Sequence, residues 1–221
     1  MRKEEDTLNL IVYVAIGATF VQFLSGTLVC KQYVVNRSTG DASPLPFISA
    51  IASCAVWLLY GFVKSDANLI CINIIGITLM VIYTVVFYLY AQKKRSVIKQ
   101  AVLLLIFLMT VTEYTIVDTN YFRVKDNLGI LACVLTLFTI GAPLSKLLHV
   151  IHVQNTECLP FPMILMSFIV CTMWYMYGKL IDDMFIQLPN FLGGLIAAFQ
   201  LLLFVVYPSK ASASASSTSL I

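Results

Sequence analysis

The sequence predicts an all-α membrane protein with seven transmembrane helices, arranged as two parallel three-helix bundles joined by an inverting fourth helix (3-1-3). Three observations predict it. Hydrophobic residues make up 60% of the 221 residues and charged residues only 11%, which excludes an ordinary soluble domain. Seven apolar runs each approach the roughly 20 residues that a membrane-spanning helix needs. A motif in the first half of the chain recurs 117 residues later.

The seven apolar runs are typical of helices, because their continuous hydrophobicity does not alternate as barrel strands do. The few charged residues within them, such as Glu113 and Lys146, lie near a run's end. We expect the first run to be a retained membrane helix and not a secretory signal, because acids outnumber basic residues in Met1–Asp6. The predicted spans are residues 8–30, 45–63, 68–91, 98–117, 128–149, 160–179 and 185–207.

The recurring motif contains both tryptophans of the chain, Trp57 and Trp174. The same register pairs Cys54 with Cys171, Tyr60 with Tyr177, Gly61 with Gly178, Asp66 with Asp183, Asn73 with Asn190, and Gly76 with Gly193. Such a match indicates an internal repeat of three spans. Because three spans reverse the chain's direction, the unrepeated fourth span is needed to make the two bundles parallel.

The repeat and the spans together predict four segments. These are a first triple-helix bundle (1–92), an inverting linker helix with its loops (93–126), a second triple-helix bundle (127–207) and a disordered cytoplasmic tail (208–221). The loop after the third span carries Lys93, Lys94, Arg95 and Lys99. Basic loops stay in the cytoplasm, so the N-terminus is predicted to be extracellular and the C-terminus cytoplasmic.

The paired tryptophans and asparagines are the candidate substrate-binding residues. Asn73 and Asn190 lie within spans, where an unpaired amide is costly unless it faces a cavity or a partner helix. Trp57 and Trp174 offer flat apolar faces for stacking. Indoles and amides suit an uncharged ring rimmed with hydroxyls, such as a sugar. The plainer alternatives are interhelical contacts for the asparagines and an interfacial aromatic belt for the tryptophans.

Two further sets of residues point to moving parts. Tyr60, Asp66, Tyr177 and Asp183 gather at the predicted extracellular helix ends, where a tyrosine–carboxylate hydrogen bond could close a gate; solvated acids and belt tyrosines explain them equally well. Pro46, Pro143 and Pro160 lie near the cytoplasmic ends of their spans, and Gly26 is the repeat equivalent of Pro143. Prolines remove a helix donor and can form hinges, although Pro46 and Pro160 also fit simple helix starts.

Several classes of function are excluded or disfavoured. The chain has no phosphate-binding glycine loop and no nucleophile–base pair, so we expect no enzyme activity and no cofactor. His149 and His152 have no third ligand nearby, so no metal site is expected. A net charge of +3 gives no sign of nucleic-acid binding. Glu113 is the one candidate proton carrier within a span.

The sequence resembles the SWEET family of sugar facilitators over nearly its whole length. The resemblance rests on S-T-G-D-A-S-P-L-P-F (38–47), W-L-L-Y-G (57–61), N-I-I-G (73–76), A-P-L-S (142–145), E-C-L-P-F-P (157–162), W-Y-M-Y-G (174–178) and L-P-N (188–190). It implies a uniporter that moves mono- or disaccharides by alternating access, with parallel repeats, a topology for which this family is an established example.

The resemblance also implies residue roles. The family's pocket falls on Trp57, Asn73, Trp174 and Asn190, with further size-selecting positions at Ser53 and Gln22. Its extracellular latch falls on Tyr60 and Asp183. Its four hinge prolines fall on Gly26, Pro46, Pro143 and Pro160, the first of which departs from the pattern. Family members form homo-oligomers, so a homo-oligomer in lipid is expected, in the plasma membrane or in an endomembrane such as the Golgi.

Two bulky indoles favour a glucose-like hexose over sucrose, and the lack of a deep acid favours uniport over proton coupling. Two alternatives are a PQ-loop transporter of amino acids from an organelle and a seven-helix receptor. The first would need Pro-Gln pairs, which the sequence lacks, and a buried aspartate, which we do not expect. The second gives no reason for a repeat of the first three helices. The sequence does not identify the sugar, the affinity or the oligomer size.

Overall fold

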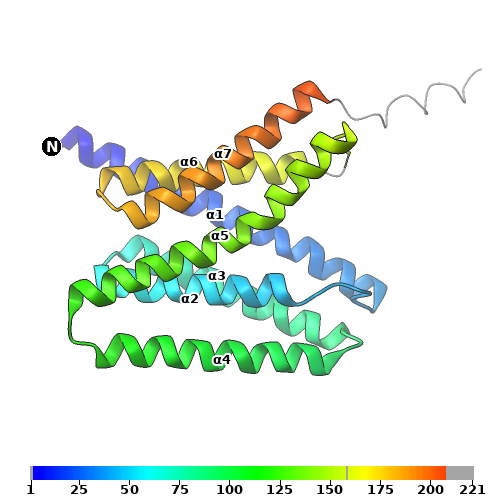
Figure 1. Cartoon of the computed structure of the whole chain (residues 1–221), viewed down its shortest axis with the longest axis horizontal. Coiled ribbons are helices and arrows are strands. Elements are labelled where there is room, and N and C mark those ends of the chain that lie inside the picture. The colour runs from blue at the N-terminus through cyan, green and yellow to red at the C-terminus, as the bar shows by residue number, and fades with distance from the viewer. Residues whose placement is uncertain (1, 158, 208–221) are drawn as a thin grey trace, which may run out of the picture. The chain divides into compact units, whose positions relative to one another are not determined.

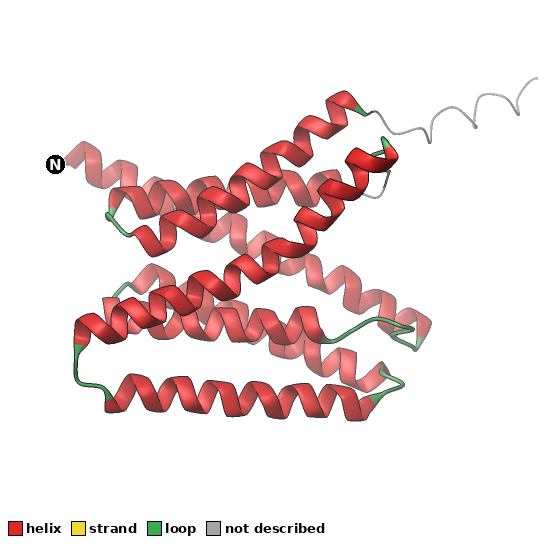
Figure 2. Ribbon diagram, viewed as in Figure 1, coloured by secondary structure: helices red, strands yellow, loops and turns green. Residues whose placement is uncertain are grey.

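A computed structural model of the chain describes residues 2–157 and 159–207. Over these ranges it contains helices and connecting loops, without a strand (Figure 2). All seven described helices are long and apolar enough to cross a membrane, which confirms the predicted fold class. In chain order (Figure 1) they are α1 (Arg2–Asn36), α2 (Leu45–Lys64), α3 (Ala67–Tyr90), α4 (Lys94–Val117), α5 (Tyr121–Val153), α6 (Phe161–Leu180) and α7 (Met184–Val206). The predicted disordered tail, 208–221, lies outside the described residues.

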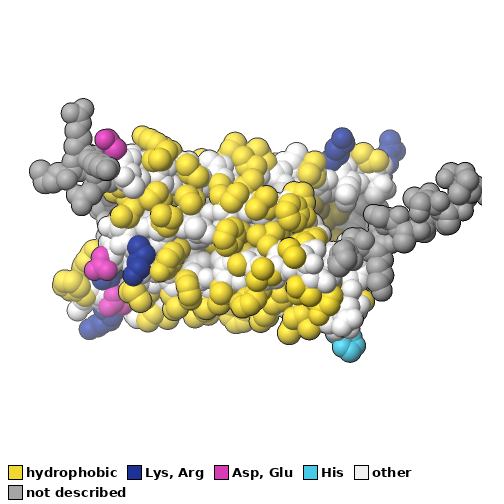
Figure 3. Space-filling view, turned by 90° about the horizontal axis from the view of Figure 1, so that it is seen from above, with side chains coloured by type: hydrophobic (Ala, Val, Ile, Leu, Met, Phe, Trp, Pro, Cys, Tyr) yellow, Lys and Arg dark blue, Asp and Glu magenta, His cyan; other side chains and the backbone are white. Residues whose placement is uncertain are grey.

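The outer surface of the helices is apolar. Hydrophobic side chains are spread over the face seen in Figure 3, and the charged side chains lie toward its two ends. Large hydrophobic residues such as Met109, Phe138 and Val205 are largely exposed. A surface of this kind would aggregate in water and is stable in hydrocarbon, where the helices satisfy their own backbone groups.

The described residues divide into two compact units that share the two longest helices. The α2–α4 unit holds residues 12–136, which include most of α1 and the first half of α5. The α6–α7 unit holds the described residues of 1–11 and 137–221, which include the second half of α5. The predicted division at residues 92, 126 and 207 stays a prediction.

The core of the α2–α4 unit brings together three helices through Cys30 of α1, Ile51 of α2, and Met80 and Tyr83 of α3, all buried. α2 and α3 pack closely because a glycine, Gly76, lies where they cross. A Cβ on Gly76 would come within 2.9 Å of the Cys54 sulfur. Glycine is therefore required where the two helices cross.

The α6–α7 unit repeats this construction. Its core cluster contains Val150, Leu159, Ile164 and Ala197. A Cβ on Gly193 would lie 2.9 Å from the sulfur of Cys171, the equivalent of the contact between Gly76 and Cys54. The internal repeat therefore holds in the helix crossing as well as in the sequence.

The α2–α3 and α6–α7 turns are also built alike. Asp66 precedes α3, and its carboxylate accepts hydrogen bonds from the backbone N–H groups of residues 68 and 69, at 3.0 and 3.1 Å. Asp183 precedes α7 and accepts equivalent bonds from residues 185 and 186, at 3.0 and 3.4 Å. Both aspartates thus satisfy N–H groups that a helix start leaves without partners.

The opposite end of each helix pair is closed by a threonine in a loop. The backbone N–H of Thr39 donates to the Tyr90 carbonyl at 3.3 Å. In the second repeat the Thr156 hydroxyl donates to the Tyr207 carbonyl at 2.8 Å. Thr39 and Thr156 are both buried. These contacts tie the α1–α2 and α5–α6 loops to the ends of α3 and α7.

Candidate functional site

Trp57 lies in the middle of α2, half-buried, with its ring held at two points. Its indole Nε1–H donates to the Thr136 hydroxyl on α5 at 3.0 Å. The Tyr60 ring, one helical turn later, meets the indole edge to face, with centroids 5.7 Å apart and planes at 89°. Such aromatic pairs are favourable, so the indole is firmly placed.

Trp174 of α6 has the same aromatic partner in the second repeat. The rings of Trp174 and Tyr177 are 5.5 Å apart at 86°. Only 7% of Trp174 is exposed. A belt tryptophan lies at the lipid–water boundary, so this burial fits a structural or binding role better than a belt role.

Asn73 and Asn190 carry the amides of the candidate site. Each donates one Nδ2 hydrogen to the carbonyl of the residue four earlier in its own helix: Asn73 to Leu69 and Asn190 to Ile186, both at 2.8 Å. Neither side chain makes another hydrogen bond to a residue that the structure describes. The amide oxygen and second N–H of each asparagine therefore remain available to a ligand.

The helix crossings place each tryptophan at the level of the asparagine of its own repeat. Cys54 lies against Gly76, and Trp57 and Asn73 each lie about one helical turn from that crossing, toward the α2–α3 turn. In the second repeat, Trp174 and Asn190 are related in the same way to Cys171 and Gly193. Each unit thus carries one indole and one amide about one turn from its own helix crossing.

Asn190 also borders a groove between α6 and α7. The groove has a volume of about 280 Å³ and includes Phe168, Tyr175 and Phe191 in its walls. Trp174 is not among its lining residues. The second asparagine is therefore accessible from an apolar groove within its own unit.

The two size-selecting positions are both half-buried. Ser53 lies in α2, one turn before Trp57. Gln22 lies in α1, where its backbone carbonyl accepts a hydrogen bond from the Ser25 hydroxyl at 2.7 Å. The structure places both on helices of the α2–α4 unit, and their contribution to selectivity stays a prediction.

Three of the four predicted gate residues are deeply buried, and the fourth, Asp66, is half-buried. Tyr60, Tyr177 and Asp183 are 1%, 3% and 3% exposed, so they are not the solvated residues of the plainer alternative. Asp66 and Asp183 serve as the helix caps described above, a role that the sequence did not reveal. A latch between Tyr60 and Asp183 stays a prediction.

The hinge residues occupy different kinds of position. Pro46 is the second residue of α2 and Pro160 immediately precedes α6, where proline costs no internal helix hydrogen bond. α5 continues through residue 143, but the Pro143 side chain lies outside the described residues. Gly26 faces the Tyr83 ring, which a Cβ at this position would overlap.

The Tyr83 hydroxyl forms a polar contact beside Gly26. It donates to the backbone carbonyl of Phe23 at 3.1 Å and lies 2.9 Å from the Thr27 hydroxyl. The Tyr83 side chain therefore packs against α1 where the repeat would place a hinge. The Tyr83 hydroxyl competes with a backbone N–H of α1 for the Phe23 carbonyl.

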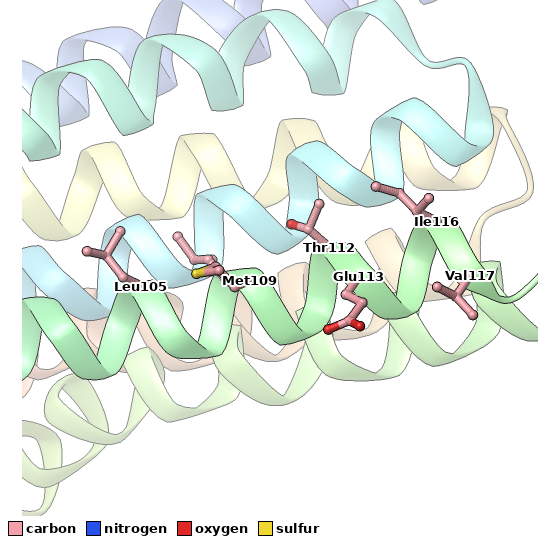
Figure 4. A pocket seen from close by; sticks show the side chains of 7 residues that line it. Leu105, Met109, Thr112, Glu113, Ile116 and Val117 are labelled. Atoms are coloured by element: carbon pink, nitrogen blue, oxygen red, sulfur yellow. The ribbon is translucent and has the colours of Figure 1, made fainter.

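Glu113, the candidate proton carrier, lies on an exposed face of α4. It borders a shallow apolar hollow of about 530 Å³ formed by the α4 residues Leu105, Leu108, Met109, Thr112, Ile116 and Val117. In Figure 4 its carboxylate points away from Thr112 and Ile116. Because α4 has no counterpart in the repeat, Glu113 lies outside both repeats. Within the described ranges, no group of three histidine, cysteine or acidic residues is placed to bind a metal.

Two contacts near the candidate residues were not predicted from the sequence. Thr136 holds the Trp57 indole, and Gln187, 5% exposed, donates from Nε2 to the Gly178 carbonyl at 3.0 Å. The 117-residue register offered a signal for Thr136, because it pairs this residue with Thr19. Gln187 replaces an isoleucine of the first repeat, so the repeat gave no signal for it.

Both copies of the repeat match a known protein family. A family model described as sugar efflux transporter for intercellular exchange matches residues 9–95 and 126–212 separately. The two matches cover α2, α3, α6 and α7 and most of α1 and α5, and they leave out nearly all of α4, which confirms the 3-1-3 order.

Individual proteins are similar along most of the chain. "Sugar transporter SWEET1" of Drosophila pseudoobscura pseudoobscura is 42% identical, covering 91% of this chain and 90% of the relative. "Bidirectional sugar transporter SWEET7" of Arabidopsis thaliana is 31% identical, covering 84% of this chain and 74% of the relative.

A solved structure shares the fold. The structure of a eukaryotic SWEET transporter superposes with a TM-score of 0.82, at 24% identity, covering 91% of this chain and 98% of the other. With the duplicated family match, the 42% identical relative and the repeated Trp–Tyr–Asn arrangement, the chain belongs to the SWEET family.

Proposed function

We propose that the protein is a passive, bidirectional sugar uniporter that works by alternating access. The observation that carries the proposal is the repeated pair of Asn73 and Asn190, each with unused amide groups and each at the level of a placed tryptophan. Relatives named sugar transporters and a bidirectional sugar transporter support it. In this proposal, Trp57, Asn73, Trp174 and Asn190 line one central pocket.

The chemistry of these residues selects the substrate class. Indole faces pack against the C–H-rich faces of a pyranose, and the free amide atoms can both donate to and accept from its hydroxyls. None of these four residues is charged, so an ionic substrate would be left uncompensated. Two indoles restrict the space, and we therefore propose a glucose-like hexose, with Ser53 and Gln22 tuning the size that fits.

Uniport follows from the placement of acids. Proton coupling requires a group inside the membrane that binds and releases a proton during the cycle. Glu113 is exposed on α4, which lies outside both repeats. Asp66 and Asp183 cap helices at the ends of their spans. Asp66 and Asp183 each precede the asparagine of their own repeat by about two helical turns.

The moving parts follow the family pattern. Tyr60 and Asp183, supported by Asp66 and Tyr177, form the extracellular gate. The helix starts at Pro46 and Pro160, with Pro143 and Gly26 in α5 and α1, form the intracellular hinges. The basic loop before α4 remains in the cytoplasm, which leaves the N-terminus extracellular. The protein acts in the plasma membrane as a homo-oligomer.

The experiment is transport by the purified protein in liposomes. Vesicles loaded with unlabelled glucose should take up labelled glucose by exchange, and net uptake should persist after a protonophore collapses the pH gradient. A panel of glucose, fructose, galactose, trehalose and sucrose defines selectivity. Empty vesicles and vesicles containing heat-denatured protein serve as controls.

Three outcomes would contradict the proposal. Uptake that stops with the protonophore would indicate proton coupling. Transport of amino acids in place of sugars would indicate the PQ-loop alternative. Ligand-dependent recruitment of a cytoplasmic protein without any sugar flux would indicate a receptor.

A further inference from the structure

A directed chain of hydrogen bonds ends on the Trp57 indole. The Thr136 hydroxyl donates its own hydrogen to the Ala132 carbonyl at 2.9 Å. Its oxygen therefore presents lone pairs to the Trp57 Nε1–H, 3.0 Å away. Because an indole nitrogen only donates and a hydroxyl has one hydrogen, the direction of both bonds is fixed.

We propose that Thr136 is a positioning residue for substrate binding, which fixes the plane of Trp57 and takes up its only N–H. The inference deepens the proposed function and rests on it. A sugar would then meet Trp57 through the ring face alone, and its hydroxyls would bond to the asparagine amides. Thr136 need not touch the sugar.

The contacts around Trp57 leave its ring little freedom. Tyr60, 1% exposed, holds one side edge to face at 5.7 Å, and Thr136 holds the nitrogen. A ring that is fixed before binding loses less rotational entropy when a ligand stacks on it. Removal of the hydroxyl would also leave a half-buried N–H without its partner, which disfavours the observed rotamer.

The hydrogen bond from a threonine hydroxyl to an alanine carbonyl occurs in both repeats. Thr19 of α1 donates to the Ala15 carbonyl at 2.7 Å, as Thr136 does to Ala132. The register of 117 residues pairs both threonines and both alanines. Ala15 and Ala132 are completely buried. A hydroxyl turned back onto a buried alanine carbonyl is thus a repeated feature of the first helix of each repeat.

The test uses the fact that the chain contains only two tryptophans. A Trp174→Phe background leaves Trp57 as the single reporter. Ultraviolet resonance Raman spectra then read the hydrogen-bonding state of its N–H directly. Thr136→Val, nearly isosteric, should shift the N–H band to that of an unbonded indole, whereas Thr136→Ser should keep the original band.

Transport provides the second measurement, made with both tryptophans present. Thr136→Val should raise the KM for glucose about fivefold to tenfold, the effect of losing one hydrogen bond, with a smaller change in maximal rate. Thr136→Ser should restore the KM. Thr110→Val is the matched control, because the Thr110 hydroxyl also donates to a carbonyl four residues earlier, at 3.0 Å, on exposed α4.

Two results would overturn the inference. One is an unchanged Raman band in Thr136→Val. The other is the same rise in KM when Thr136→Val is added to Trp57→Phe, which has no N–H to hold. If the wild-type protein moves no sugar, the proposed function fails, while the Raman comparison still decides whether Thr136 holds the indole.

Discussion

Asn73 and Asn190, 117 residues apart, each use one amide hydrogen in the same 2.8 Å bond to a carbonyl one turn earlier. This bond fixes the amide plane without consuming the amide oxygen or the second N–H. An asparagine that served only to join helices would direct its groups to a neighbouring helix. The shared geometry supports our proposal that each asparagine offers a donor and an acceptor to a ligand.

Replacement of either amide should therefore impair transport more than folding. We expect Asn73→Ala and Asn190→Ala each to lower glucose uptake at least tenfold, because a sugar hydroxyl would lose its partner. Thr78→Val, which removes a similar helix-facing hydroxyl bond on the exposed side of α3, should leave uptake near wild type. Normal uptake by both asparagine variants would remove the pocket from the account.

The two aspartate caps separate helix stability from gating. Asparagine caps a helix nearly as well as aspartate, whereas alanine costs about 1 kcal/mol. We expect Asp66→Ala and Asp183→Ala to lower the thermal unfolding temperature in detergent. We expect Asp66→Asn and Asp183→Asn to leave that temperature unchanged.

Transport by Asp66→Asn and Asp183→Asn then shows the effect of removing the carboxylate charge while the helix cap is kept. If the Asp183 carboxylate belongs to the gate, Asp183→Asn should fold normally and transport slowly. Equal transport by Asp183→Asn and wild type would restrict Asp183 to capping.

The helix crossings at Gly76 and Gly193 predict that removing the facing cysteine sulfur will restore stability to different extents in the two glycine-to-alanine variants. A Cβ at Gly193 meets mainly the Cys171 sulfur, at 2.9 Å, whereas a Cβ at Gly76 meets both the Cys54 sulfur and the Phe23 ring, each at 2.9 Å. Overpacking of this kind costs about 1–3 kcal/mol. Gly193→Ala and Gly76→Ala should both lower the unfolding temperature.

Removal of each sulfur distinguishes the two sites. Cys171→Ala should restore most of the stability lost in Gly193→Ala, while Cys54→Ala should restore only part of that lost in Gly76→Ala. Equal rescue at the two sites would contradict the described packing around Gly76.

Orientation can be measured by labelling cysteines introduced into loops. Cys71, which is exposed, and Cys158 are first replaced by serine, while Cys54 and Cys171 are kept for packing. A membrane-impermeant maleimide should label Thr119→Cys on intact cells and Arg95→Cys only after permeabilisation, because we propose that the basic loop lies in the cytoplasm. The reverse pattern would invert the proposed topology.

Hydrophobicity was sufficient to predict the number of helices but not the length of the longest two. The first and fifth spans were predicted at 8–30 and 128–149, whereas α1 and α5 run from Arg2 to Asn36 and from Tyr121 to Val153. Their polar ends remain helical although they lie beyond the apolar run, so a hydrophobic pattern cannot detect them.

The candidate residues were predictable because the repeat marks them, while their partners were not. Asp66 and Asp183 were recognised as a pair, but the sequence alone did not show that their carboxylates cap helices. Thr136 could have been found from its pairing with Thr19, yet the contact with Trp57 depends on how α2 packs against α5. Tertiary contacts of this kind have no local sequence signal.

The central claim, one sugar held by both repeats, is tested most directly by a measurement across them. In a Trp174→Phe background, glucose should change the fluorescence of Trp57 in the first repeat with a saturating dependence on concentration. Asn190→Ala, in the second repeat, should abolish that response or move its midpoint at least tenfold higher. An unchanged midpoint for Trp57 would show that the two repeats do not share a site and would contradict the account.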